Sequence, residues 1–200
     1  MRILGVFVLL ALSVVVYFVG WPKYQTQRDT KAAITYLLNP STPNMWYAEL
    51  NKFPHLTAIP EEIKQVKNLT RVSINGTQIS DGSILAEIPA LEWVSANMSK
   101  IENIAPLASL PNLKALQIYG TPVRDLGPVA DMPRLERLDI GNTITETLEP
   151  VTRIKNLKWL NLFKGMSYDG SQKYFEIIKG KQLLGLSGGN RYAQNYMPRR

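Results

Sequence analysis

The 200-residue sequence has the length of one domain with short appendages, and 45% of its residues are hydrophobic, so most of the chain can fold. The formal net charge is +7, but residues 53–190 carry 15 Lys and Arg against 14 Asp and Glu, which places the excess near the two ends. This distribution argues against a nucleic-acid partner, because nucleic-acid-binding domains concentrate basic residues on a folded face. The absence of cysteine excludes disulfides, thiolate catalysis and cysteine-ligated zinc.

Residues 3–21 are predicted to form an uncleaved transmembrane signal anchor, within an N-terminal segment 1–22. These 19 residues carry no charge. As a helix they would reach about 28 Å, close to the ~30 Å hydrocarbon core of a bilayer. A cleaved signal peptide and a buried soluble helix are the alternatives, but Phe18 does not fit the small residue expected before a cleavage site. A very short N-terminal tail usually stays inside, so the bulk of the chain is expected outside a bacterial inner membrane, facing the periplasm or exterior.

Residues 23–52 are predicted to form a helical N-terminal cap. Asp29 and Thr30 are good capping residues for a helix over 31–38, which Pro40 would end. Thr42 and Pro43 predict the start of a second helix that extends to about residue 52, because proline is favoured in the first helical turn.

A repeat of 22 residues begins at Asn68 and is the strongest signal in the sequence. Leucine recurs at this interval at Leu69, Leu91, Leu113, Leu135 and Leu157. Apolar residues follow three and five positions after each of them, and a divergent sixth copy contains Leu183 and Leu186. Self-similarity at a fixed period predicts a solenoid, in which each coil buries its apolar side only against neighbouring coils. Residues 53–190 are therefore predicted to form the repeat domain.

The second half of each repeat is also regular. Thr or Ser stands eight residues after the first leucine, and prolines align at Pro106, Pro128 and Pro150. These prolines predict an extended or 3-10 outer side without long helices. Residues 60–68 match the back half of an additional, degenerate repeat. A helix is predicted over 171–179, and a basic, partly ordered tail over 191–200.

The segments IENIAPLASLPNL (101–113) and VRDLGPVADMPRL (123–135) resemble the leucine-rich repeats of bacterial internalins. The resemblance covers roughly residues 53–190. It implies an α/β solenoid: a leucine-rich-repeat arc with a short parallel sheet on the concave face. That family commonly has Asn at the eighth position, whereas this chain has Thr or Ser, a smaller side chain that can still bond the backbone. The resemblance indicates the fold and says little about function.

No catalytic or metal-binding pattern is recognised in the sequence. His55 is the only histidine and has no second ligand or nucleophile pattern near it. Asp81 and Asp125 share a repeat position, but Asn103 and Thr147 interrupt that column, which argues against a ladder of calcium ions. The chain is therefore expected to be a binding protein, not an enzyme, with no cofactor, metal or small-molecule substrate.

The concave face is the predicted partner surface, because residues two, four and six positions after each first leucine point away from the core. Trp, Tyr and Arg are the residue types that dominate binding hot spots. The predicted partner-binding residues are Arg71, Trp93, Gln117, Tyr119, Arg137, Asp139, Gly141, Trp159, Asn161 and Phe163. The alternative is that the aromatic residues only pack along the sheet.

The geometry of this register predicts one specific feature, a notch between Tyr119 and Phe163 over Gly141. Arg137 is expected to stack on Trp159 and to be held by Asp139. The leading hypothesis for function is a membrane-anchored protein-binding module, in its sharper form an immunity or inhibitor protein that binds a toxin or effector. The alternative is a structural cell-envelope or adhesion protein.

Overall fold

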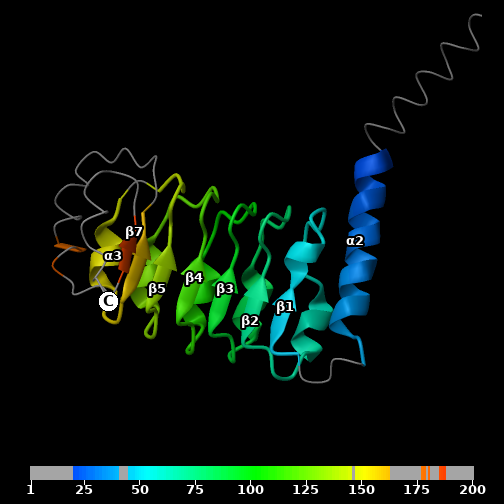
Figure 1. Ribbon diagram of the computed structural model, residues 1–200, viewed down its shortest axis with the longest axis horizontal. Helices are drawn as coiled ribbons and strands as arrows, with labels where there is room; N and C mark the ends of the chain where they lie inside the picture. The colour runs from blue at the N-terminus through cyan, green and yellow to red at the C-terminus, as the bar shows by residue number, and fades with distance from the viewer. Residues whose placement is uncertain are drawn as a thin grey trace, which may run out of the picture.

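The repeats build a sheet that is one strand longer than the sequence pattern predicts. The computed structural model describes residues 20–40, 45–145, 147–162, 177–178, 180 and 185–187. In this part of the chain, three-residue strands form one seven-stranded sheet in chain order (Figure 1). The strands are β1 (Tyr47–Glu49), β2 (Arg71–Ser73), β3 (Trp93–Ser95), β4 (Ala115–Gln117), β5 (Arg137–Asp139), β6 (Trp159–Asn161) and β7 (Gly185–Ser187). All neighbouring pairs are parallel.

The outer side of the solenoid consists of single turns, as the prolines predict. Four 3-10 helices follow one another on this side: η3 (Glu61–Gln65), η4 (Ser83–Glu87), η5 (Ala105–Ser109) and η6 (Gly127–Asp131). A short α-helix, α3 (Glu149–Arg153), takes the same place in the next coil. Proline occupies the first turn of η5, η6 and α3, where its missing N–H removes no hydrogen bond.

The apolar columns lie in one continuous core, and the predicted phase is confirmed. Leu69, Leu91, Leu113 and Leu135 have no exposed surface, and Leu157 is buried. Residues three and five positions later are buried as well, up to Leu160. Leu160 is also in register with Leu186, as predicted for the sixth copy. Leu183 lies outside the described residues.

Two polar columns hold the backbone where each strand ends. The hydroxyls of Thr77, Thr121 and Thr143 donate to the carbonyl three residues earlier, at 2.7–2.8 Å. The expected bonding of the eighth position to backbone is therefore observed. A ladder of asparagines lies two positions before this Thr or Ser column. The Asn75 Oδ1 accepts from the Asn97 N–H, and the Asn97 Oδ1 accepts from the Tyr119 N–H.

The turn after each of four strands passes through the left-handed backbone region. The residues concerned are 22 apart: Gly76, Met98, Gly120 and Asn142, with φ of 68°, 57°, 66° and 55°. Glycine and asparagine tolerate this region, whereas a long side chain is uncommon there. Met98 is therefore the one unfavourable residue in this column.

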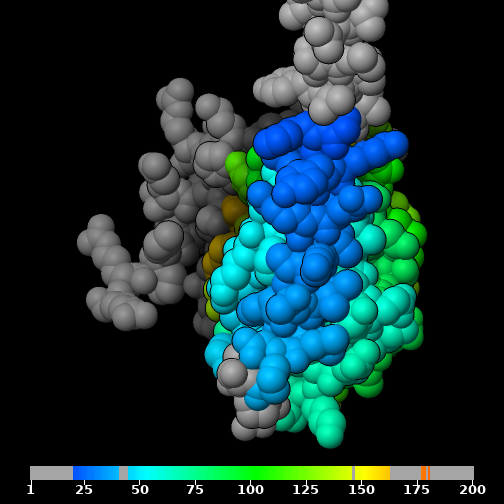
Figure 2. Space-filling view, turned by 90° about the vertical axis from the view of Figure 1, so that its right-hand side faces the viewer, coloured from blue at the N-terminus to red at the C-terminus, as the bar shows by residue number. Residues whose placement is uncertain are grey.

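The N-terminal helix differs from the prediction for residues 31–38. It is α2 (Trp21–Leu37), a single helix that begins ten residues earlier, with Pro22 in its first turn. Asp29 does not cap it. The buried carboxylate of Asp29 accepts from the backbone N–H of His55 at 2.9 Å and from the guanidinium of Arg28 at 2.8 Å, so it ties the middle of the helix to the next coil. Figure 2 shows α2 lying across the N-terminal end of the solenoid.

The predicted second helix up to residue 52 is wrong, because this segment is part of the solenoid. It forms β1 and the 3-10 helix η2 (Leu50–Lys52). Met45, Ala48 and Leu50 are buried and have the same three-and-five spacing as the repeat leucines. Their first residue lies 24 positions before Leu69, two more than the repeat period. The sheet therefore begins before the predicted boundary at residue 53.

Three predicted segments lie largely outside the described residues. Of the proposed membrane span 3–21, only residues 20 and 21 are described. None of the helices in the described part of the chain combines the length and apolar character that a membrane crossing requires. Of the predicted helix 171–179, Ile177 and Ile178 are described and are helical, with Ile178 buried. The tail 191–200 is not described.

Candidate functional site

The first outward-facing column of the sheet brings Arg71, Trp93, Ala115, Arg137 and Trp159 into register on neighbouring strands. Parallel strands lie about 4.8 Å apart, so side chains at equivalent positions contact one another across the sheet. Arg137 is exposed, and Arg71, Trp93 and Trp159 are half-buried. Ala115 is 1% exposed and leaves only a methyl group between the neighbouring Trp and Arg.

The arginine and tryptophan side chains of this column, with Trp46 beside its first member, stack on one another. The Arg71 guanidinium carbon lies 4.2 Å from the ring centre of Trp93 and 5.7 Å from that of Trp46. The Arg137 guanidinium lies 5.7 Å from the ring of Trp93 and 5.4 Å from the ring of Trp159. These separations are in the range of cation–π interactions. The predicted stacking of Arg137 on Trp159 is therefore observed. We call Trp46, Arg71, Trp93, Arg137 and Trp159 the Trp–Arg row.

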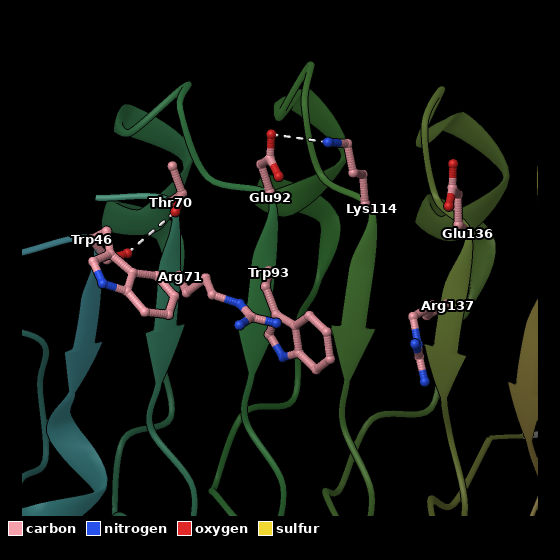
Figure 3. A pocket seen from close by; sticks show the side chains of 8 residues that line it. All are labelled: Trp46, Thr70, Arg71, Glu92, Trp93, Lys114, Glu136 and Arg137. Atoms are coloured by element: carbon pink, nitrogen blue, oxygen red, sulfur yellow. Dashed lines mark hydrogen bonds and ion pairs between the residues drawn. The ribbon is translucent and has the colours of Figure 1, made fainter. Parts of the chain in front are cut away.

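A hollow of about 380 Å³ lies along this row, as Figure 3 shows. Its lining residues are Trp46, Thr70, Arg71, Glu92, Trp93, Lys114, Glu136 and Arg137. In Figure 3 the Arg71 side chain extends towards Trp93, and Arg137 lies on the far side of β4 from it. The hollow is thus centred nearer the N-terminal end of the sheet than the predicted notch.

A row of alternating charge borders the hollow at the starts of the strands. Lys114 Nζ lies 3.0 Å from a carboxylate oxygen of Glu92, and Lys158 Nζ lies 2.9 Å from one of Glu136. Each glutamate therefore has a lysine of the next coil as its counter-ion. These pairs are exposed, so each contributes at most about 1 kcal/mol to stability.

The second outward-facing column is polar and largely internally bonded. The Trp93 indole N–H donates to Gln117 Oε1 at 3.2 Å, which fixes the plane of the ring. The predicted ion pair of Asp139 with Arg137 is wrong. The Asp139 carboxylate accepts instead from the Gly141 N–H at 3.1 Å and from the Asn161 side-chain amide at 3.0 Å. Burial raises the pKa of Asp139, although these two hydrogen bonds act in the opposite direction.

The predicted notch is only partly described. Tyr119 is half-buried and Gly141 is buried, with its carbonyl accepting from the Gly120 N–H at 2.9 Å. Phe163, the other predicted wall, lies outside the described residues. The notch therefore stays a prediction.

The sequence prediction missed five residues of the hollow: Trp46, Thr70, Glu92, Lys114 and Glu136. Trp46 was assigned to a helix because its coil is two residues longer than the repeat period. Thr70 and the three charged residues stand one position before the outward-facing column. Their repeated place in front of each strand is the signal that could have identified them.

The repeat position that Asp81 and Asp125 share serves the fold. Asp81, Asn103, Asp125 and Thr147 each accept a hydrogen bond from the backbone N–H two residues later, at 2.7–3.1 Å. Such local bonds fix turns, in this chain at the starts of the outer-side helices. Among the residues that the structure describes, no cluster of His, Asp and Glu is arranged to hold a metal ion.

Comparison with protein-family models gives no match, and comparison with curated protein sequences gives none either. Solved structures do match. An internalin (inlF) of Listeria monocytogenes is 18% identical with a TM-score of 0.56, covering 80% of this chain and 55% of that one. Internalin C2 of the same organism is 16% identical with a TM-score of 0.53, covering 78% and 74%. A leucine-rich-repeat protein of Leptospira interrogans is 21% identical with a TM-score of 0.56, covering 66% and 35%.

At these levels of sequence identity the likeness shows the fold alone. The chain spans about half the length of the first of these structures. The likeness rests on the arrangement of the backbone. The 22-residue repeat, the parallel sheet of short strands and the structural matches together show that the chain folds as a leucine-rich-repeat solenoid, similar in backbone arrangement to the internalins.

Proposed function

We propose that this solenoid is a protein-binding module that contacts its partner through the concave sheet. The Trp–Arg row is the observation that carries the proposal. Trp46 is 53% exposed, and neither it nor the arginines belong to the apolar core. A solenoid does not need aromatic side chains on its solvated face, whereas Trp and Arg are the residues most often found at the energetic centres of interfaces.

The dimensions of this face suit a protein partner. The Trp–Arg row extends from β1 to β6, five strand spacings or roughly 24 Å. A surface of that length, widened by the polar second column, is comparable to one side of a standard protein interface of about 800 Å². The shallow hollow supplies a place for a few anchoring side chains of the partner.

The proposal includes a membrane anchor. The uncharged residues 3–21 support it by their length and composition, and they would hold the solenoid at a bacterial inner membrane, facing the periplasm or exterior. In its specific form, the proposal is that the chain is an immunity or inhibitor protein that covers a toxin or effector arriving in that compartment. One binding face on a short tethered chain suits that role.

Site-specific photo-crosslinking of the full chain in cells tests the binding face. A benzoylphenylalanine is placed at Gln117 on the concave sheet or, as the matched control, at the exposed outer-side residue Lys155. We expect a crosslinked protein at Gln117 that is absent or much weaker at Lys155. Equal adducts at both positions, or an adduct at Lys155 alone, would contradict the proposal.

The identity of the crosslinked protein separates the two functional classes. For an immunity protein, expression of that partner alone should arrest growth, and co-expression of the chain should restore it unless Trp93 is replaced by Ala. For an envelope or adhesion protein, the partner should be a cell-surface component whose expression leaves growth unchanged.

A further inference from the structure

Two arginines of the Trp–Arg row share a single indole. The guanidinium carbons of Arg71 and Arg137 lie 4.2 and 5.7 Å from the ring centre of Trp93. They are therefore no further apart than these two distances together, about 10 Å. Ala115, on the strand between Trp93 and Arg137, is too small to separate them and is almost fully buried.

Neither guanidinium is neutralised by a carboxylate within the described part of the chain. The ion pairs there do not include Arg71 or Arg137. Glu92 and Glu136, which also line the hollow, are paired with Lys114 and Lys158. Asp139, two residues after Arg137 on β5, is buried and bonded to Gly141 and Asn161.

The local charge therefore favours an anionic ligand. Around the hollow, Glu92 and Glu136 are balanced by Lys114 and Lys158, so Arg71 and Arg137 leave an excess of two positive charges there. Each guanidinium carbon lies 4.2 to 5.7 Å from an indole ring centre, and the side-chain hydrogen bonds of the described residues do not use the N–H groups of Arg71 or Arg137. Arginine donors at fixed positions are suited to carboxylates, which they bind through two parallel hydrogen bonds.

We propose that the Arg71–Trp93–Arg137 cluster recognises an extended acidic segment of the partner protein, with two carboxylates at positions i and i+2. This inference rests on the proposed protein-binding function and adds the chemistry of the partner. In an extended chain, side chains two residues apart lie on the same side, about 6.6 Å apart. Side chains of Asp or Glu bridge the remaining distance to two guanidiniums that are at most about 10 Å apart.

The Trp93 ring between the two cations makes the site selective for that spacing. Its indole N–H is held by Gln117, so the ring presents a fixed apolar surface between the two charges. A partner backbone crossing this ring would place one carboxylate on each side of it. A single carboxylate would use only one arginine and would bind less tightly.

A synthetic peptide of sequence Gly-Ser-Asp-Thr-Asp-Ser-Gly, labelled with a fluorophore, tests the inference directly. Its binding to the full chain in mild detergent is measured by fluorescence anisotropy at low salt. The matched peptide has Asn in place of both Asp. We expect the acidic peptide to bind at least tenfold more tightly than its amide counterpart, and its affinity to fall as salt is added. Equal affinities for the two peptides would overturn the inference.

Charge-matched variants assign the binding to the cluster. Arg71→Gln and Arg137→Gln should each weaken acidic-peptide binding at least fivefold. Arg124→Gln removes the same charge from an exposed residue outside the row and should leave the affinity within twofold. Arg71→Lys retains the charge without the forked donors, and intermediate affinity is expected. An equal loss in Arg124→Gln would show that only net charge matters and would overturn the assignment.

Competition decides the class of anion. An unlabelled acidic peptide should displace the labelled peptide. A single-stranded oligonucleotide, added at a phosphate concentration equal to the carboxylate concentration of that peptide, should displace it less. Stronger displacement by the oligonucleotide would overturn the inference. Crosslinking at Gln117 that persists in the Arg71→Gln, Arg137→Gln double variant would leave the proposed function intact and refute only the acidic-segment recognition. Acidic-peptide binding without any crosslinked protein would refute the proposed function instead.

Discussion

Replacement of Leu138 by Ala should destabilise the solenoid strongly, because this side chain lies at the centre of the repeating core. Leu138 has no exposed surface and is in register with Leu116 and Leu160, which are also fully buried. The substitution removes three carbon atoms, worth about 0.8 kcal/mol each in lost burial. Incomplete closure of the resulting cavity brings the expected loss to about 3–5 kcal/mol.

The loss is measured by urea unfolding of the full chain in mild detergent, followed by circular dichroism. The control is Lys155→Ala, since Lys155 is exposed on the outer side and should contribute less than ~0.5 kcal/mol. The slope of the transition should be the same in all three proteins, because the surface exposed on unfolding hardly changes. A Leu138→Ala loss below ~1 kcal/mol, or no difference from the control, would refute the assigned phase of the repeat.

Three further substitutions test individual contacts. For Asp29, burial alone would raise the pKa, but hydrogen bonds from the His55 N–H and Arg28 lower it below the usual value. The stabilising contribution of the Asp29 carboxylate should therefore be present above pH ~4 and disappear as the pH falls through the folded-state pKa. Asp29→Asn should lower the melting temperature at pH 7 and lower it much less at pH 3. The pKa of Asp139 is raised by burial, so its contribution should be lost as the pH rises, and Asp139→Asn should raise the melting temperature at pH 7 but not at pH 3. A difference from the parent chain that stays constant between pH 3 and pH 7, in either variant, would contradict the expected direction of that pKa shift. Met98→Gly should stabilise the chain by up to ~1 kcal/mol in urea unfolding by relieving a left-handed backbone, and a loss of stability would show that the Met98 side chain matters more than its φ of 57°.

The core could be predicted from sequence because it depends on one periodic pattern. Once Leu69 and the leucines that follow at intervals of 22 residues are aligned, the buried columns follow from the alternation of side chains along a strand. The same alignment placed Arg71, Trp93, Arg137 and Trp159 on the concave face. Prediction succeeded for these residues because each coil repeats the environment of its neighbour.

Prediction failed where a coil departs from the period. The first coil has buried residues that correspond to the repeat leucines, namely Met45, Ala48 and Leu50. They lie 24 residues before the next coil and not 22, so the 22-residue period does not identify them, and Pro43 indicates a helix start. The extra length lies outside the strand, so the strand still pairs in register with β2. A search that allowed a small insertion between repeats would have found this coil and, with it, Trp46.

The partner of Asp139 could not be predicted from spacing alone. By spacing alone, Arg137, two residues earlier on the same face, is as good a partner for its carboxylate as the Gly141 N–H and the Asn161 amide. The Gly141 N–H is a backbone donor fixed by the chain path, and leaving it unbonded in a buried position would cost about 1–3 kcal/mol. The orientation of the Asp139 side chain is therefore determined by backbone groups that need a hydrogen-bond partner. An alignment of residue types at repeat positions does not show which backbone groups these are.

The register of the sheet also bears on how the binding face can change in evolution. Each coil bonds only to the coils before and after it, so an in-frame gain or loss of 22 residues would leave the remaining coils with equivalent neighbours. A coil inserted between β3 and β4 would move Arg137 away from Arg71 by one strand spacing, about 4.8 Å. The separation of these two charges can therefore change only in steps of one coil, and a chain with one more coil would require acidic residues that lie further apart in its partner.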